Sequence, residues 1–167
     1  HPAVDEAAPG RALVTAGPTV EPLDPVRFLS NHSSGRQGYA IAEALAALGA
    51  DTTLVSGPTA RPAPAGVHRV DVTTARDMLA ACRAALPADV AVMVAAVADW
   101  RPDDAAPLKL KKGESGPPTI QLVENPDILA TLSAPGPSRP RLVVGFAAET
   151  NDVEPHARAK RLRKGCD

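Results

Sequence analysis

The sequence contains very few aromatic residues and very few cysteines. Aromatic side chains make up 2% of the 167 residues, so a core has to be built from aliphatic side chains. The two cysteines, Cys82 and Cys166, lie far apart and lack the spacing of metal ligands. Two cysteines make a weak case for a disulfide, so we expect a protein of the reducing cytoplasm, with Cys82 as a small core residue.

A strong excess of charge is also lacking. The formal net charge is -1, which argues against nucleic acid or an anionic membrane as a partner held by bulk charge. No apolar run approaches the roughly 20 residues of a membrane span, and the first residues do not resemble a signal peptide.

The usual sets of covalent catalytic residues are missing as well. We find no H-E-x-x-H pattern, no plausible Ser-His-Asp set and no cysteine nucleophile with a histidine partner. His32 is the one histidine in a loop that resembles a motif. We therefore expect a chemistry that works by positioning and charge rather than through a protein nucleophile.

The length and the hydrophobic fraction of 44% fit one domain with one core. Residues 1–10 are rich in Pro and Ala and lack a period, so they predict a linker or a cloning remnant. Residues 11–167 are expected to form the α/β domain.

Hydrophobic patterning predicts strands that alternate with helices. Strands are expected at residues 11–17, 51–56, 67–72, 89–96 and 141–146. Helices are expected at 36–48 and at 153–164, the second ending before Gly165. A further helix is expected from the cap residue Thr74 to about residue 86. A short helix is expected after the cap residue Asn125, with Pro126 in its first position. This alternation predicts a parallel sheet, and ligands of such sheets bind beyond the carboxyl ends of the strands.

The segment after the first strand offers a phosphate site. Ser33, Ser34 and Gly35 precede a helix, whose first N–H groups and positive dipole end attract anions. Arg27 and Asn31 lie just before it and add a fixed charge and an amide donor. The alternative is that a serine merely caps the helix and Arg27 is a solvated surface charge. The length of this loop favours a functional role.

A dinucleotide fingerprint does not fit this segment. The pattern G-x-G-x-x-G has to follow the strand directly, whereas Gly17 and Gly35 are too far apart. The second strand ends at Ser56, Gly57 and Pro58, without an acid for a ribose diol.

Further polar residues follow the central strand. Asp99 can accept ribose hydroxyls or help to hold Mg²⁺, or it can simply cap a turn. Trp100 can stack on a base or can pack against the protein. Residues 108–112 and 119–123 are expected to be short extended pieces. The first piece contains Lys109, Lys111 and Lys112, which predict either a basic flap over a polyphosphate or an edge strand protected by lysines. Asp127 adds a carboxylate that capping alone could explain.

Together these motifs resemble the phosphopantothenate–cysteine ligase family, in its bacterial form fused behind a flavin-dependent decarboxylase. The matching stretches keep the order of the family, and the first of them is highly specific. They are 15–38 (TAGPTVEPLDPVRFLSNHSSGRQG), 95–102 (AAVADWRP), 109–112 (KLKK), 125–129 (NPDIL) and 145–150 (GFAAET).

The resemblance implies a three-layer Rossmann-like, mostly parallel sheet with helices on both faces and a small extended flap or dimerisation segment. It implies that CTP with Mg²⁺ activates 4′-phosphopantothenate as an acyl-cytidylate, which L-cysteine then captures. Catalytic roles are implied for Asn31, Lys109 and Arg27. The implied nucleotide-binding positions are Gly17, Ser33, Ser34, Gly35, Gly38, Ala96, Asp99, Trp100, Asp127 and Phe146.

The resemblance also implies a homodimer and a fused N-terminal decarboxylase in the full-length protein, with no flavin in this part. The family continues beyond Asp167 into another strand, so we expect a C-terminally incomplete domain. Two alternatives stay open: an NAD(P)-binding oxidoreductase and an inactive dimerisation fragment. The residues by themselves do not distinguish CTP from ATP, and they do not identify the metal ligands.

Overall fold

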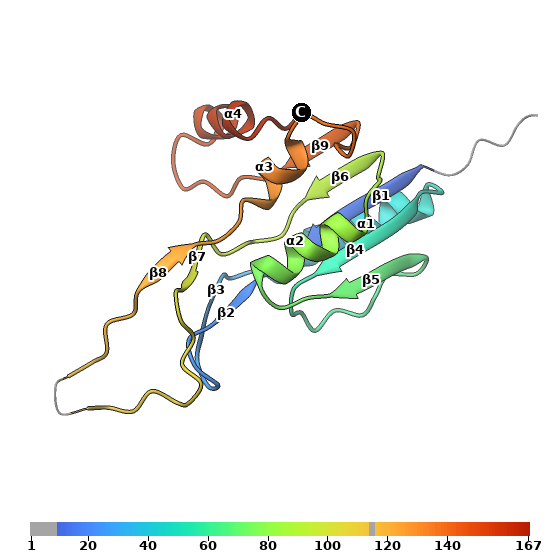
Figure 1. Ribbon diagram of the computed structural model, residues 1–167. Helices are drawn as coiled ribbons and strands as arrows, with labels where there is room; N and C mark the ends of the chain where they lie inside the picture. The colour runs from blue at the N-terminus through green and yellow to red at the C-terminus, as the bar shows by residue number, and fades with distance from the viewer. Residues whose placement is uncertain (1–9, 114–115) are drawn as a thin grey trace, which may run out of the picture.

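The computed structural model describes residues 10–113 and 116–167. Residues 1–9 of the expected linker lie outside this part. The centre is a five-stranded parallel sheet in the order β5-β4-β1-β6-β9 (Figure 1). Its strands are β1 (Arg11–Ala16), β4 (Asp51–Ser56), β5 (Val67–Asp71), β6 (Val90–Met93) and β9 (Leu142–Gly145). The expected parallel α/β fold is therefore confirmed, although β6 ends three residues earlier than the apolar run does.

Both faces of the sheet are covered. Alternate residues of β1 point to opposite faces, so Leu13 and Val14 enter different core clusters. Helix α1 (Arg36–Ala47) covers one face, where Tyr39 and Ala42 are buried. Helices α2 (Ala75–Ala84) and α3 (Ile128–Ser133) cover the other face, and α4 (Val153–Lys164) contacts α3 beside β9 (Figure 1). No described helix is long and apolar enough to cross a membrane.

Local signals located the helix ends well, with one exception. Thr74 caps α2 in a capping box: its hydroxyl accepts from the Asp77 N–H, and the Asp77 carboxylate accepts from the Thr74 N–H. Gly165 ends α4 in the left-handed conformation that glycine favours. The expected Asn125 cap of α3 is wrong, because Asp127 is the N-cap and accepts from the Ala130 N–H at 2.9 Å.

Two antiparallel hairpins extend from the carboxyl end of the sheet. Strands β2 (Val20–Pro22) and β3 (Phe28–Ser30) pair within the segment after β1, which we interpreted from the sequence as a loop. Strands β7 (Trp100–Pro102) and β8 (Leu122–Glu124) pair at the base of a long excursion, whose described residues, 103–113 and 116–121, we call the arm. The arm projects beyond the β2–β3 hairpin (Figure 1). Residues 108–112 form no strand, and β8 starts later than the expected 119–123.

Candidate functional site

A pocket of about 440 Å³ opens at the carboxyl ends of β1 and β6. Thr15 and Met93, from the ends of these strands, line its inner wall together with Met78 of α2. The Thr15 hydroxyl accepts from the Ala95 N–H at 3.2 Å, which fixes the chain where it leaves β6. The pocket therefore lies where parallel α/β sheets bind ligands.

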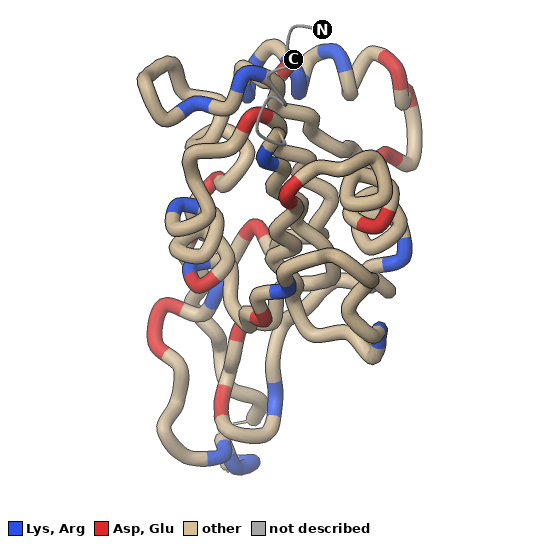
Figure 2. Tube along the Cα trace, turned by 90° about the vertical axis from the view of Figure 1, so that its right-hand side faces the viewer, with Lys and Arg blue, Asp and Glu red and all other residues tan. Residues whose placement is uncertain are grey.

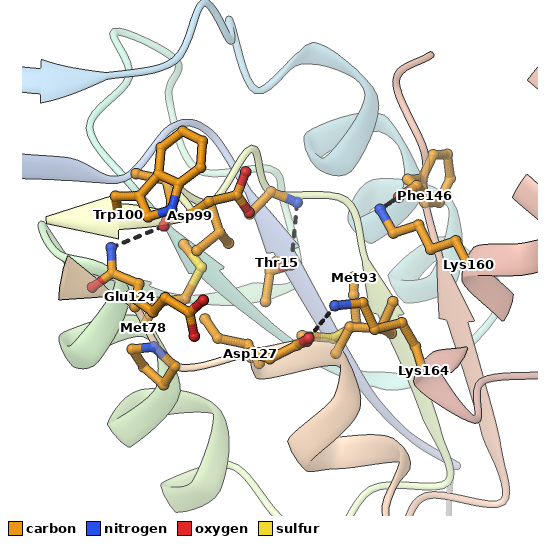
Figure 3. Close-up of a pocket in the computed structure, with 17 residues that line it drawn as sticks. Thr15, Met78, Met93, Asp99, Trp100, Glu124, Asp127, Phe146, Lys160 and Lys164 are labelled. Atoms are coloured by element: carbon orange, nitrogen blue, oxygen red, sulfur yellow. Dashed lines mark hydrogen bonds and ion pairs between the residues drawn. The ribbon is translucent and has the colours of Figure 1, made fainter. Parts of the chain in front are cut away.

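Charges of both signs line the pocket. Asp99 and Glu124 lie near Trp100, whereas Lys160 and Lys164 of α4 lie on the opposite side (Figure 3). Trp100 is 57% exposed at the rim, so its ring is available for stacking on a ligand. An anionic group and a polar aromatic group of one ligand could bind at the two sides at once.

The lysine side of the pocket is already organised by contacts within the protein. Lys164 forms an ion pair with Asp127, and Lys160 donates to the carbonyl of Phe146 at 2.6 Å. Desolvation raises the pKa of Asp127, but hydrogen bonds from Lys164 and the Ala130 N–H, with both lysine charges, bring that pKa below its ordinary value. Asp127 is thus a carboxylate at neutral pH.

The acidic side is held by Asn125. The Asn125 amide donates to the carbonyl of Ala98 at 2.8 Å, and its backbone N–H donates to the carbonyl of Asp99 at 2.8 Å. Asn125 therefore fixes the turn that carries Asp99 instead of capping the next helix.

The start of α1 lies across the same segment, next to the pocket. The Asn31 amide donates to the carbonyl of Ala96 at 3.0 Å, and the Ala96 N–H donates to the carbonyl of Gly17 at 2.9 Å. Gly35 is the N-cap of α1, with φ 71°, and this helix end has no side-chain cap. Because Ala96 lies between Ala95 and Val97 of the pocket wall, the α1 start and the pocket adjoin.

The two serines before α1 make local contacts. The hydroxyl of Ser33 accepts from the Gly35 N–H at 3.3 Å, and that of Ser34 accepts from the Arg36 N–H at 3.4 Å. Both distances are long for hydrogen bonds. An anion with stronger acceptors could replace these contacts, since the positive end of the helix is directed at this turn.

Gly38 has a packing role that its motif position did not indicate. A Cβ atom at Gly38 would lie 2.5 Å from the Cβ of Ala16 and 2.9 Å from the carbonyl of Thr15. Only glycine allows α1 to approach β1 this closely. The glycine thereby brings the helix start to the end of the strand.

Arg27 and Lys109 lie away from the pocket wall. Arg27 follows the β2–β3 turn and binds Asp24 through its guanidinium, while Lys109 lies exposed on the arm. The predicted residues thus form three groups. Asp99, Trp100, Asp127 and Phe146 line the pocket; Gly17, Asn31, Ser33, Ser34, Gly35, Gly38 and Ala96 surround the α1 start; Arg27 and Lys109 belong to the hairpin and the arm.

Three charged residues of the pocket were missed in the sequence. Glu124 ends the β8 strand, and Lys160 and Lys164 lie four residues apart on α4. The spacing of the two lysines puts them on one helix face, which was the signal available. Without knowing where α4 packs, a helix face that lines a pocket could not be distinguished from a helix face exposed to solvent.

Comparisons with known proteins identify the family of this chain. The family model described as "DNA/pantothenate metabolism flavoprotein C-terminal domain" matches residues 8–167. Similar relatives are the coenzyme A biosynthesis bifunctional proteins CoaBC of Vibrio cholerae, at 51% identity over 94% of this chain, and of Escherichia coli K12, at 54% over 93%. The Mycobacterium bovis CoaBC is 52% identical over the whole chain.

The chain spans less than half of these curated relatives: 40%, 39% and 43% of their lengths, respectively. Among solved structures, the C-terminal domain of CoaBC matches with a TM-score of 0.79 and 44% identity, over 94% of this chain and 74% of that one. A Cab2 mutant in complex with phosphopantothenate-cysteine shares the fold, with a TM-score of 0.74 at 18% identity, over 95% of this chain and 70% of that one. The family model and these relatives show that the chain belongs to the DNA/pantothenate metabolism flavoprotein C-terminal domain family.

Proposed function

We propose that this chain is the ligase domain that joins 4′-phosphopantothenate to L-cysteine at the expense of CTP in coenzyme A biosynthesis. The observation that carries the proposal is the pocket at the carboxyl edge of the sheet, which has Asp99 and Trp100 on one side and the lysines of α4 on the other. The domain that contains it is similar to the C-terminal domain of CoaBC. A site with this charge pattern suits a nucleotide with its phosphates.

The reaction has two steps. The carboxylate of 4′-phosphopantothenate attacks the α-phosphorus of CTP, the bond to the β-phosphate breaks, and pyrophosphate leaves. The amine of cysteine then attacks the acyl carbon, displaces CMP and loses a proton to form the amide. Neither step needs a protein nucleophile, which fits a site built of donors and charges.

The pocket suits the nucleoside. Trp100 offers a ring face at the rim, and Asp99 offers a carboxylate for ribose hydroxyls or a metal. Lys160 and Lys164 offer positive charge for phosphate oxygens. The start of α1, next to the Ala96 segment, offers N–H donors and a helix dipole for the triphosphate.

Asn31 and Lys109 would act on the acyl-cytidylate intermediate, and Arg27 would act on the acyl half of the reaction. The Asn31 amide lies at the junction of the α1 start and the pocket wall, where it can orient an acyl-phosphate oxygen. Lys109 has a mobile charge on an exposed arm, which suits neutralisation of the departing pyrophosphate.

Mg²⁺ would enter together with the triphosphate. Among the described residues, no cluster of three or more His, Cys, Asp or Glu side chains forms a dedicated cation site. Mg²⁺ often uses one or two carboxylates plus substrate phosphates, and the pocket provides Asp99 and Glu124 for this purpose. The ion would offset phosphate charge during the first step.

The test is CTP binding by the Asp99→Ala variant. We expect a clear loss of CTP-Mg²⁺ affinity in calorimetry with an unchanged melting temperature, because Asp99 is exposed and makes no described side-chain bond. Asp51→Ala, at the opposite end of the sheet, is the matched control. Normal CTP binding by Asp99→Ala, or a preference of the wild type for NADPH, would overturn the proposed site.

The assembly is part of the same proposal. We propose a cytoplasmic homodimer with residues 102–123 in or near the interface, because β7, β8 and the arm lie outside the main sheet. The isologous symmetry of such a dimer would place two arms together. Light scattering that gives a monomer at high concentration would contradict it. A stable dimer that ignores CTP would favour a non-catalytic assembly module.

A further inference from the structure

Asp24 is a buried carboxylate that the proposed reaction does not use. The residue is 4% exposed and lies in the turn between β2 and β3. Burial of a carboxylate is costly unless the charge is paired and hydrogen-bonded. The contacts that offset this cost therefore indicate what Asp24 does.

The two oxygens of Asp24 have different partners. Oδ1 accepts from the backbone N–H groups of Val26 and Arg27, both at 2.8 Å. Oδ2 accepts from the Arg27 guanidinium at 3.0 and 2.6 Å, and from the backbone N–H of Leu110 at 3.1 Å. The Oδ1 contacts close a local turn. The Oδ2 contacts join Arg27 to the arm, 86 residues along the chain, which the turn does not require.

The same joint is reinforced on both sides of Asp24. The Arg27 guanidinium also donates to the carbonyl of Leu110 at 2.5 Å. The Ala106 N–H donates to the carbonyl of Leu23 at 3.0 Å. Lys109 lies between these two attachment points, so its backbone has fixed neighbours although its side chain is exposed.

The charge state of Asp24 agrees with such a joint. Desolvation raises the pKa of the carboxyl group, but the combined hydrogen bonds from Arg27, Val26 and Leu110 hold the pKa far below its ordinary value. Asp24 is a carboxylate throughout the neutral range, and an amide in its place could not accept from all of these donors.

We propose that Asp24 is a positioning residue, which fixes the Arg27 guanidinium and holds the arm so that Lys109 is presented to the reaction. The role rests on the proposed ligase function, in which Arg27 and Lys109 act directly and Asp24 acts only through them. Arg27 and the arm would then work as one unit, coupled through a single carboxylate.

The first test is Asp24→Asn in the purified protein. Whichever way the new amide turns, its NH₂ group faces N–H donors, and the loss of the negative charge weakens the contacts with the Arg27 guanidinium and the Leu110 N–H. We expect pyrophosphate release from CTP and 4′-phosphopantothenate to slow by about 10²-fold, the scale of a misplaced catalytic group. The Kd of CTP should not change, because Asp24 is not part of the pocket. Asp51→Asn is the matched control and should behave as wild type.

Hydrogen exchange provides a readout that does not depend on activity. The Leu110 amide should exchange faster in Asp24→Asn than in the control, because its acceptor is weakened. The Ala106 amide, which is bonded to the Leu23 carbonyl, should follow, because the arm then has weaker attachment to the hairpin. If the wild type makes no pyrophosphate, the ligase function fails while this measurement still tests the joint. Unchanged exchange at both amides would overturn the joint itself.

Leu110→Pro serves as a second variant if Asp24→Asn fails to fold. It removes the N–H that the arm donates to Asp24 and leaves the bonds between Asp24 and Arg27 in place. It should slow pyrophosphate release in the same direction. Wild-type release by both folded variants would overturn the positioning role.

A double-mutant cycle then separates positioning from a general structural role. If Asp24 acts through Lys109, Asp24→Asn should slow the reaction much less in a Lys109→Gln background than in the wild type. An equal slowing in both backgrounds would show that Asp24 does not act through Lys109.

Discussion

The lysines of α4 and the lysines of the arm are of one residue type but lie in contrasting environments. Lys160 and Lys164 line the pocket, and each is bonded to a protein oxygen. Lys109 and Lys112 lie exposed on the arm, where Figure 2 shows a basic segment near its far end, and no side-chain bond is described for either. The first pair is held in place before a ligand arrives, whereas the second can meet a ligand only by reaching toward it.

This difference separates two uses of positive charge. A lysine that contacts a ligand equally in the ground state and the transition state contributes mainly to affinity, and we expect this of Lys160 and Lys164. A lysine that meets charge only as it develops during the reaction contributes mainly to rate, and we expect this of Lys109. The following experiments test this division.

The largest effect is expected for Lys109→Gln. We expect pyrophosphate release to slow by about 10²–10³-fold, the usual cost of one lost charge-stabilising group. CTP affinity should stay near that of the wild type. A rapid-quench assay that follows pyrophosphate and CMP separately measures both steps, with Lys112→Gln as control. If only CTP affinity falls, Lys109 is a binding residue and the division between the two groups is wrong.

A smaller effect of the opposite kind is expected for Lys164→Gln. We expect the Kd of CTP to rise by about ten-fold, which corresponds to about 1.4 kcal/mol for one lost charged contact. The rate at saturating CTP should change little. Calorimetry and saturation kinetics measure the two quantities, with the exposed Arg163→Gln on another face of α4 as control. An unchanged Kd combined with a reduced rate would reverse the assignment.

The smallest effect concerns acid. The pKa of Asp127 is lower in the folded state than in the unfolded state, where it is about 4. The ion pair of Asp127 with Lys164 therefore stabilises the fold at pH values above the unfolded pKa. This stabilisation is lost as the pH falls through the folded-state pKa of Asp127. For a partly exposed pair the loss is about 0.2–1 kcal/mol. Melting curves from pH 6 downward should fall less steeply for Lys164→Gln than for the wild type. Parallel curves would show that the pair contributes nothing measurable.

The main sheet could be predicted from the sequence because its signals are local. The apolar runs located all five strands, and the Thr74 capping box set the start of α2. The β2–β3 hairpin could not be predicted, because its anchors are tertiary: Glu21 accepts from the Ala75 N–H, and Asp24 binds Leu110. A segment with several prolines does not indicate a strand without such partners.

The candidate site divides in the same way. Asp99 and Trp100 were predictable because they follow a central strand, where ligands of parallel sheets bind. The roles of Asn125 and of the α4 lysines depend on which face meets the pocket, and a single sequence does not contain that information. The sequence therefore located the edge of the sheet where the pocket opens, together with Asp127 and Phe146, and missed the two lysines of the opposite wall.

The close approach of α1 to β1 has a consequence for how this motif is read in other proteins. Gly38 is required by the carbonyl of Thr15 and the methyl group of Ala16, both of which belong to the protein itself. In a library of all substitutions at position 38, a screen that reports folding should accept glycine alone. This result should hold even in cells that are supplied with coenzyme A and need no ligase. A sequence search that requires this glycine therefore selects proteins in which a helix packs closely on a strand. Nucleotide preference has to be inferred from the residues of the pocket instead.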